Sequence, residues 1–230
     1  MKPFLLLLTS VLLILPAWAQ DAPDELSTRP NSFVSLESQI PSLQVELRYF
    51  TSRNFVGRPI EGYHANHAYA TRQTAQALQA VQATLASQGL GLKVFDAYRP
   101  QRAVDHFVRW AADSNDVDMK PEYYPSLEKD QLFPQGYIAE RSGHSRGSTV
   151  DVTLVRLADL NELDMGSPYD FFDPVSWPSD TSITEQQRAN RMILRDAMLA
   201  HGFRPLDTEW WHFTLENEPY TDVYFDFPVE

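Results

Sequence analysis

The sequence predicts an α+β fold in which helices flank a small, largely antiparallel sheet. The chain mixes helical and strand periodicities, but these do not alternate in the regular rhythm of strand, helix and strand that builds a parallel sheet. No internal repeat and no low-complexity tract is visible. The length of the chain suits one domain with a single core.

Residues 1–19 are predicted to be a secretory signal peptide. An apolar run follows Lys2 and ends at Ala17-Trp18-Ala19, the small-residue pattern of a cleavage site. Because this run is too short to span a bilayer, we expect cleavage after Ala19 rather than a retained membrane anchor. The mature protein is then a single domain over residues 20–230, exported to the periplasm or secreted.

The composition narrows the kinds of partner and site that we expect. A formal net charge of −12 disfavours binding to nucleic acid or to an anionic membrane surface. The chain has no cysteine, which excludes disulfides and thiolate chemistry. A metal site in this protein must therefore be built from histidine, aspartate and glutamate side chains.

Helical and strand patterns can be followed along the mature chain. The first half is predicted to hold, in order, an extended segment over 43–49, a helix over 68–87, a strand over 92–98 and a helix that starts at Pro100. The second half is predicted to hold, in order, a loop over 114–136, a strand over 150–154, a loop over 159–179, a helix over 182–201 and a strand over 210–215. We expect a capping box from Ser182 to Glu185 to open the last helix and Gly202 to end it.

Two segments concentrate the residue types that bind metal ions. One runs from Ser142 to Asp151 and contains His144 between two glycines, and the other is Glu209-Trp210-Trp211-His212. Small residues let the backbone turn sharply around His144, so its imidazole and the Asp151 carboxylate can converge from a loop and the following strand. Together with His212 they would hold one Zn²⁺ at the edge of the sheet, with the open fourth position of a catalytic site.

Glu209 is predicted to be the catalytic acid and base. Residues three apart on a regular strand face opposite sides, so Glu209 and His212 could not both face one ion from such a strand. We therefore expect Glu209 to lie in the turn before the strand, where Asp207-Thr208 supplies turn residues. From there its carboxylate could take a proton from the attacking water and return it to the leaving amine.

Each of these features has a plainer interpretation when it is taken alone. A histidine in a glycine-rich loop is commonly a surface residue, and Trp210 and Trp211 are typical core aromatics. His64 and His67 could form a second metal pair, but no carboxylate other than Glu61 accompanies them at helical spacing. The combination of the two segments, in this order, favours a single zinc site.

The two segments also resemble the signature of a known family. The pattern Ser-x-His-x-x-Gly-x-x-x-Asp, followed about sixty residues later by Glu-x-Trp-His, is similar to that of the D-alanyl-D-alanine dipeptidases and their D,D-carboxypeptidase relatives, zinc enzymes of peptidoglycan metabolism. The likeness is closest to the dipeptidase branch and extends to blocks at 48–49, 54–63, 96–100, 164–170 and 209–213. The resemblance implies that His144, Asp151 and His212 are zinc ligands and that Glu209 is the catalytic acid and base.

The same resemblance implies two further roles: Arg99 would stabilise the transition state, and Asp170 would accept the ammonium group of the substrate. Ser142, two positions before a predicted zinc ligand, is placed to contact the substrate as well. A guanidinium at the end of a strand can also meet the negative charge that develops on the carbonyl oxygen, which is an argument for Arg99 from chemistry. The alternatives are an ion pair of Arg99 with Asp96 or Asp105, and an ordinary loop cap for Asp170.

These features predict a zinc-dependent peptidase that hydrolyses free D-Ala-D-Ala, or a similar D,D-dipeptide, to D-alanine. A D,D-carboxypeptidase acting on longer peptidoglycan peptides would use the same zinc centre, and a binding module would keep the pocket without turnover. Glu209 argues against the binding module, because a non-hydrolytic zinc site gains nothing from a carboxylate beside its water. Export favours salvage of cell-wall dipeptide over depletion of a cytoplasmic precursor, and the oligomeric state stays open.

Overall fold

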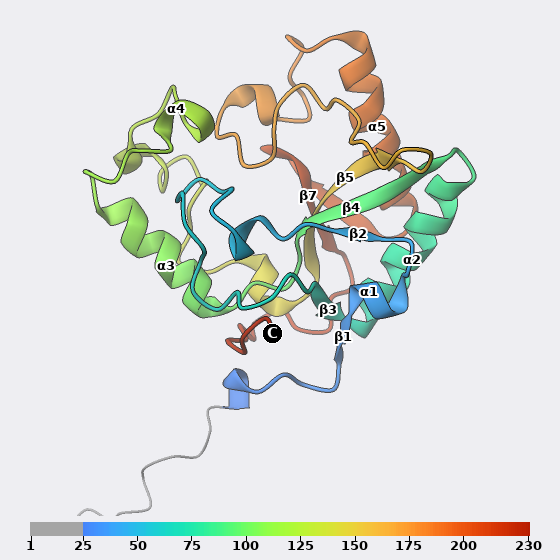
Figure 1. Ribbon diagram of the computed structural model, residues 1–230, viewed down its shortest axis with the longest axis horizontal. Coiled ribbons are helices and arrows are strands. Elements are labelled where there is room, and N and C mark those ends of the chain that lie inside the picture. Colours follow the sequence, from blue (N-terminus) through green and yellow to red (C-terminus); the bar gives the residue numbers. More distant parts are fainter. Residues whose placement is uncertain (1–24) are drawn as a thin grey trace, which may run out of the picture.

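The computed structural model describes residues 25–230 (Figure 1). The predicted signal peptide, residues 1–19, lies outside the described residues. Among the helices of the described part, none is long and apolar enough to cross a membrane.

A five-stranded sheet forms the centre of the molecule. Its strands stand in the order β2 (Gln44–Val45), β4 (Leu90–Asp96), β5 (Thr149–Arg156), β7 (Glu209–Leu215) and β6 (Phe203–Leu206). Strand β2 runs parallel to β4, and the other neighbouring pairs are antiparallel. A separate antiparallel pair is formed by β1 (Phe33–Ser35) and β3 (Tyr69–Thr71). The predicted α+β fold with a largely antiparallel sheet is therefore confirmed.

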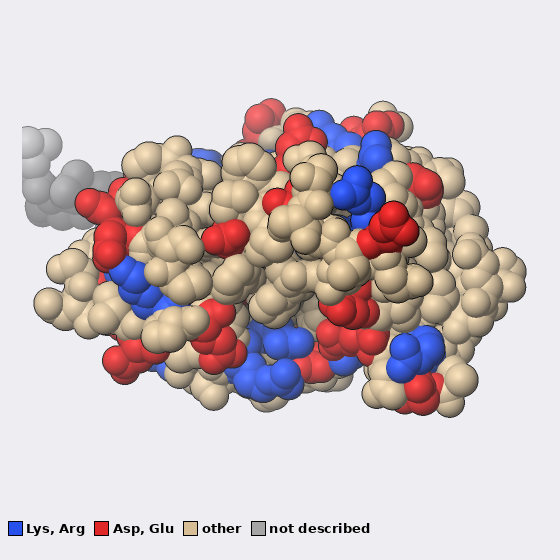
Figure 2. Space-filling model, turned by 90° about the horizontal axis from the view of Figure 1, so that it is seen from above, with Lys and Arg blue, Asp and Glu red and all other residues tan. Residues whose placement is uncertain are grey.

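Helices flank this sheet on two sides. The described helices are α1 (Leu36–Gln39), α2 (Arg72–Ala86), α3 (Gln101–Ala112), α4 (Lys120–Tyr123) and α5 (Glu185–Ala200). Helices α2 and α5 pack against the sheet and against each other, and Figure 1 shows α3 on the opposite side of the molecule. On the face seen in Figure 2, acidic and basic side chains lie next to one another rather than in separate patches.

The predicted extended segment over 43–49 is wrong beyond its first residues. Strand β2 ends at Val45, and Arg48–Phe50 forms a 3-10 turn instead. The side-chain oxygen of Asn66 accepts a hydrogen bond from the backbone N–H of Leu47 at 2.7 Å, which takes the chain away from the sheet. Leu47 and Tyr49 are nevertheless both buried, as they would be on one face of a strand. Burial without a strand therefore explains the alternating apolar pattern.

Helix α5 begins two residues later than predicted. Thr184 caps the helix, and its capping box is completed by Gln187 rather than by Glu185. Ser182 lies in the turn before the helix instead, where its backbone N–H and its hydroxyl both donate to Asp180. The predicted stop at Gly202 is confirmed, since this glycine has a φ of 82°, a conformation that favours glycine at a helix end.

Strand β5 positions the first of the candidate metal ligands. All of its residues except the last are buried, and alternate side chains on a strand point to opposite faces. Asp151 therefore points away from the face that Val150 and Val152 fill. Its side chain lines a cavity instead, together with Val104 and Phe107 of α3.

Candidate active site

His144 reaches the site from a tight 3-10 turn, Gly143–Arg146. The turn ends at Gly147 with a φ of 81°, and a Cβ atom at that position would lie 2.2 Å from the ring of Phe33. The Nδ1 atom of His144 is 2.7 Å from the carbonyl oxygen of Ala97, so the ring is held from behind and its Nε2 atom faces the cavity. The predicted sharp turn around His144 is thus present.

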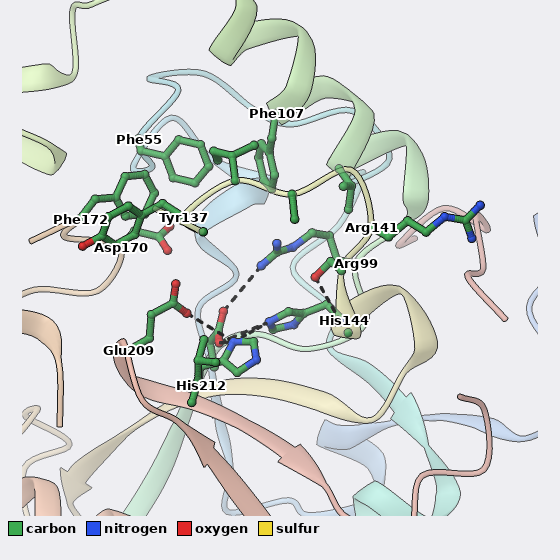
Figure 3. Close-up of a pocket in the computed structure, with 18 of the residues that line it drawn as sticks. Phe55, Arg99, Phe107, Tyr137, Arg141, His144, Asp170, Phe172, Glu209 and His212 are labelled. Carbon is green, nitrogen blue, oxygen red and sulfur yellow. Dashed lines mark hydrogen bonds and ion pairs between the residues drawn. The ribbon is translucent and has the colours of Figure 1, made fainter. Parts of the chain in front are cut away.

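Asp151 and His212 lie directly opposite each other on neighbouring strands, β5 and β7. Oδ1 of Asp151 is 3.1 Å from Nδ1 of His212 and 3.4 Å from Nε2 of His144. One ligand atom from each of the three residues lies within 4.8 Å of the others, which makes them a group that could hold a metal ion. Figure 3 shows the two imidazoles converging in the pocket from the turn and from the strand.

The chemistry of this group fits a divalent cation. Oδ1 of Asp151 is buried between two imidazoles, yet it accepts no hydrogen bond with acceptable geometry. Burial alone would raise the pKa of Asp151, but the neighbouring His144 and His212 hold that pKa well below its usual range. An ionised, unsatisfied carboxylate oxygen beside two imidazole nitrogens is the N2O donor set of a zinc site with an open position.

The second histidine pair in the sequence does not form such a site. Within residues 25–230, His64 and His67 are not part of a group that could hold a metal ion. Nδ1 of His67 lies 3.5 Å from a carboxylate oxygen of Glu37, and its side chain is 55% exposed.

Glu209 is the first residue of β7, so the predicted place in the preceding turn is wrong. Glu209 nevertheless lies beside the candidate metal ligands, as predicted, because its Oε2 atom is 3.4 Å from Nδ1 of His212. The β6–β7 ladder explains this: Leu206 pairs with Glu209 and Pro205 pairs with Phe213, which leaves 210–212 without partners on β6. This bulge breaks the alternation of faces. Burial raises the pKa of Glu209 to about 7.

Arg99 follows β4 and lines the same cavity with only 12% of its side chain exposed. Its Nε atom donates to Asp96 at 2.8 Å, and its Nη2 atom lies 3.7 Å from Oδ2 of Asp151. The ion pair with Asp96 is therefore real, but it is buried and leaves the end of the guanidinium facing the candidate metal ligands. The other suggested partner, Asp105, accepts a hydrogen bond from Gln101 instead.

Asp170 lies at the opposite wall of the cavity from Arg141, as Figure 3 shows. It is 5% exposed, has a φ of 59°, and accepts a hydrogen bond from the hydroxyl of Tyr49 at 2.9 Å. Burial, together with the charge of Asp151, raises the pKa of Asp170 well above its usual range. It is thus a buried acid in the cavity and not a loop cap.

Ser142 lines the cavity too, and it has a structural task that the sequence did not indicate. Its Oγ accepts a hydrogen bond from the backbone N–H of His144 at 3.3 Å and so caps the turn that carries the imidazole. The cavity holds about 170 Å³. The structure brings all seven predicted site residues to its walls: Arg99, Ser142, His144, Asp151, Asp170, Glu209 and His212.

Several residues of the site were missed at the level of sequence. Tyr169 places its hydroxyl 3.0 Å from Oδ2 of Asp151 and 3.1 Å from the hydroxyl of Tyr49, and thereby connects two walls of the cavity. A further part of the wall is aromatic, formed by Phe55, Phe107, Tyr137 and Phe172. Apolar periodicity marks such residues as buried but cannot distinguish the wall of a cavity from the core.

Comparison with known proteins gives a consistent result. The profile of the family described as D-ala-D-ala dipeptidase matches residues 29–230. A D-alanyl-D-alanine dipeptidase of Streptomyces coelicolor is 41% identical over 197 residues, which is 86% of this chain and 98% of the relative. A protein of the same name from Enterococcus faecalis is 41% identical over 199 residues, with the same two coverages, 86% and 98%.

More distant proteins also match. A D-alanyl-D-alanine dipeptidase of Escherichia coli is 31% identical over 182 residues, covering 79% of this chain and 83% of the relative. A solved structure of a mutant VanY D,D-pentapeptidase in complex with Zn(II) covers 66% of this chain and 76% of its own, at 13% identity and a TM-score of 0.40, a similarity too low to support an inference. The profile match and the closely similar dipeptidases show that this chain is a metallopeptidase and belongs to the D-alanyl-D-alanine dipeptidase family.

Proposed function

We propose that this protein is a zinc-dependent dipeptidase that hydrolyses free D-Ala-D-Ala, or a similar D,D-dipeptide, to D-alanine. The observation that carries the proposal is the convergence of His144, Asp151 and His212 in one cavity, with Glu209 beside them. The relatives named D-alanyl-D-alanine dipeptidase support the choice of substrate.

The three ligands would hold one Zn²⁺, whose chemistry is to polarise the carbonyl of the scissile bond and to make water more acidic. Oε2 of Glu209 lies 3.4 Å from Nδ1 of His212, so its carboxylate is next to the ligand group and within reach of a water held there. With a pKa of about 7, raised by burial, Glu209 can accept a proton at neutral pH and return it to the leaving amine.

Arg99 would stabilise the negative charge that develops on the carbonyl oxygen. Its guanidinium points into the cavity toward the ligand cluster in Figure 3, and its Nη2 atom is 3.7 Å from Asp151. A fixed donor in an enclosed site stabilises a developing oxyanion more strongly than water does, because it needs no reorientation during the reaction.

Asp170 would recognise the free ammonium of the dipeptide. A buried carboxyl whose pKa is raised well above normal by burial lacks a cation, and the ammonium would supply it. This feature favours a dipeptidase over a carboxypeptidase that acts on longer wall peptides.

The discriminating experiment compares free D-Ala-D-Ala with N-acetyl-D-Ala-D-Ala. The proposal expects rapid release of D-alanine from the free dipeptide and a loss of at least about tenfold in kcat/KM on acetylation, as expected when a buried carboxylate loses its partner. Equal rates on both substrates would favour the carboxypeptidase alternative. No turnover of either substrate by the zinc-loaded protein would contradict the proposal as a whole.

We further propose that the protein acts after export, in salvage of dipeptide released from the cell wall. The support is the signal-peptide pattern of residues 1–19. Expression of the full chain in a bacterium, followed by N-terminal sequencing of the exported protein, should give a first residue of Gln20. Recovery of an intact N-terminus from the cytoplasm would contradict export.

A further inference from the structure

A buried carboxylate behind the cavity is shared by two side chains. Asp96, at the end of β4, is fully buried. The hydroxyl of Tyr63 donates to its Oδ1 atom at 2.6 Å, and Nε of Arg99 donates to its Oδ2 atom at 2.8 Å. Each carboxylate oxygen therefore accepts one hydrogen bond, and the two donors bind different oxygens of the same group.

This sharing determines which nitrogen atoms of Arg99 remain available. Because Nε is occupied by Asp96, the guanidinium presents its Nη atoms to the cavity, with Nη2 3.7 Å from Asp151. The rings of Tyr49 and Phe107 lie 4.9 Å and 5.2 Å from the guanidinium carbon and limit its rotation. The direction of the hydrogen bond from Nε to Asp96 then determines the direction in which the two Nη atoms of Arg99 point.

Tyr63 is important to this arrangement because the carboxylate of Asp96 is fully buried and cannot accept a hydrogen bond from solvent. Without the hydroxyl, Oδ1 would be a buried carboxylate oxygen without a donor, which is strongly unfavourable. The carboxylate would relieve this by rotating toward the guanidinium and engaging two of its nitrogens. That change would withdraw an Nη atom from the cavity.

We propose that Tyr63 is a positioning residue, which fixes the Asp96 carboxylate so that Arg99 keeps its Nη atoms directed at the reacting carbonyl. The inference rests on the proposed function of Arg99. Tyr63 is itself held independently of the site, since it forms a β-bridge with Val229 and its backbone N–H donates to Ile60. Its hydroxyl is thus a fixed reference point for the carboxylate.

The effect passes through Arg99 rather than through the metal ligand next to Asp96. Nδ1 of His144 lies 3.5 Å from Oδ2 of Asp96, but it is already held by the carbonyl oxygen of Ala97 at 2.7 Å. Zinc affinity should therefore not depend on Tyr63. This separates the proposed role from a general disturbance of the metal site.

The test is Tyr63→Phe in the zinc-loaded full chain, with Tyr98→Phe as the matched control. Tyr98 is as deeply buried, precedes Arg99 directly in sequence, and donates its hydroxyl to the backbone oxygen of Phe227 at 2.9 Å. Both variants remove one buried hydroxyl and one hydrogen bond. We expect kcat for D-Ala-D-Ala to fall about tenfold in Tyr63→Phe, with KM nearly unchanged, and to stay near the wild-type value in Tyr98→Phe.

A double-mutant cycle separates positioning of Arg99 from other effects. In an Arg99→Ala background, Tyr63→Phe should have no further effect on kcat, because the group that it positions is gone. Zinc affinity, measured by competition with a chelator, should match that of the wild type within about threefold in Tyr63→Phe. A similar tenfold loss in the Arg99→Ala background, or a parallel loss of zinc affinity, would overturn the proposal.

A readout without turnover keeps this inference separate from the proposed function. Exchange of the Nη protons of Arg99, followed by NMR, should be about tenfold slower in Tyr63→Phe than in the wild type and in Tyr98→Phe, because one Nη atom then also donates to Asp96. Unchanged exchange would overturn the inference even if the wild type hydrolyses the dipeptide. Slower Nη exchange in Tyr63→Phe, found together with a wild type that does not hydrolyse the dipeptide, would contradict the proposed function and leave the Tyr63–Asp96–Arg99 linkage standing.

Discussion

The Oε2 atom of Glu209 lies 3.4 Å from the Nδ1 atom of His212, although the two residues are three positions apart on one strand. A regular strand would turn them to opposite faces. The bulge at 210–212 in the β6–β7 ladder removes that alternation and lets both side chains face one cavity. The proximity of the proposed acid/base to the proposed metal ligand thus results from the geometry of the β6–β7 hairpin.

Glu209→Gln should separate proton transfer from metal binding. We expect the variant to keep zinc, because Glu209 lies outside the group of three ligands, and to lose about 10²–10⁴-fold in kcat, the usual contribution of a positioned acid/base. Metal analysis and steady-state kinetics on the same preparation test this. If the variant lost zinc, Glu209 would be a ligand and not the base.

Removal of a ligand should abolish metal binding itself. We expect His144→Ala and His212→Ala to bind no zinc after dialysis, and the wild type to lose activity on chelation and regain it with zinc. His67→Ala is the control, because its exposed ring lies outside the ligand group. Full activity of a metal-free wild type would rule out this account of the site.

Arg99→Lys should be nearly as damaging as Arg99→Ala. A single ammonium cannot bond Asp96 and face the reacting carbonyl at the same time, whereas the guanidinium has separate nitrogens for both. We expect a loss of about 3–4 kcal/mol in transition-state stabilisation, mainly in kcat. Arg102→Lys, at an arginine that pairs with Asp226, serves as the control. An unchanged kcat in Arg99→Lys would make Arg99 a structural ion-pair residue.

Asp170→Asn should change which substrates the protein distinguishes. Loss of the carboxylate should weaken hydrolysis of free D-Ala-D-Ala while leaving the poor N-acetylated substrate almost unaffected, so the ratio of their kcat/KM values should fall by about tenfold or more. The measurement is kcat/KM for both substrates in wild type and variant. An unchanged ratio of the two kcat/KM values would show that Asp170 does not bind the ammonium group of the substrate.

The same variant should change the pH dependence of stability. Because the pKa of Asp170 is raised in the folded state, the folded protein binds more protons than the unfolded chain above about pH 4, and its stability falls as pH rises through the folded-state pKa. Asparagine does not titrate, so the variant lacks this loss of stability with rising pH. In metal-free protein, the free energy of unfolding of Asp170→Asn relative to wild type should therefore increase between pH 5 and pH 8, as measured by urea denaturation. A constant difference would contradict the raised pKa.

The sequence alone determined the ligand chemistry and the class of fold. A chain without cysteine that concentrates His144, Asp151 and His212 in two short segments can build an N2O metal site and no thiolate site. Helices α2, α3 and α5 could be predicted because their apolar periodicity and their start or stop signals are local properties of the chain. The helix predicted over 68–87 begins too early, however, since residues 69–71 form β3, whose pairing with β1 is not local.

Only the tertiary structure decided how the remaining site residues are oriented. The turn predicted at Glu209 was wrong because the register of β6 against β7, and not the local sequence, determines where the bulge falls. The contacts of Asp170 with Tyr49 and of Asp96 with Tyr63 join residues 121 and 33 positions apart. No periodicity of helix or strand relates such distant positions, so contacts of this kind follow from the packing of the whole domain.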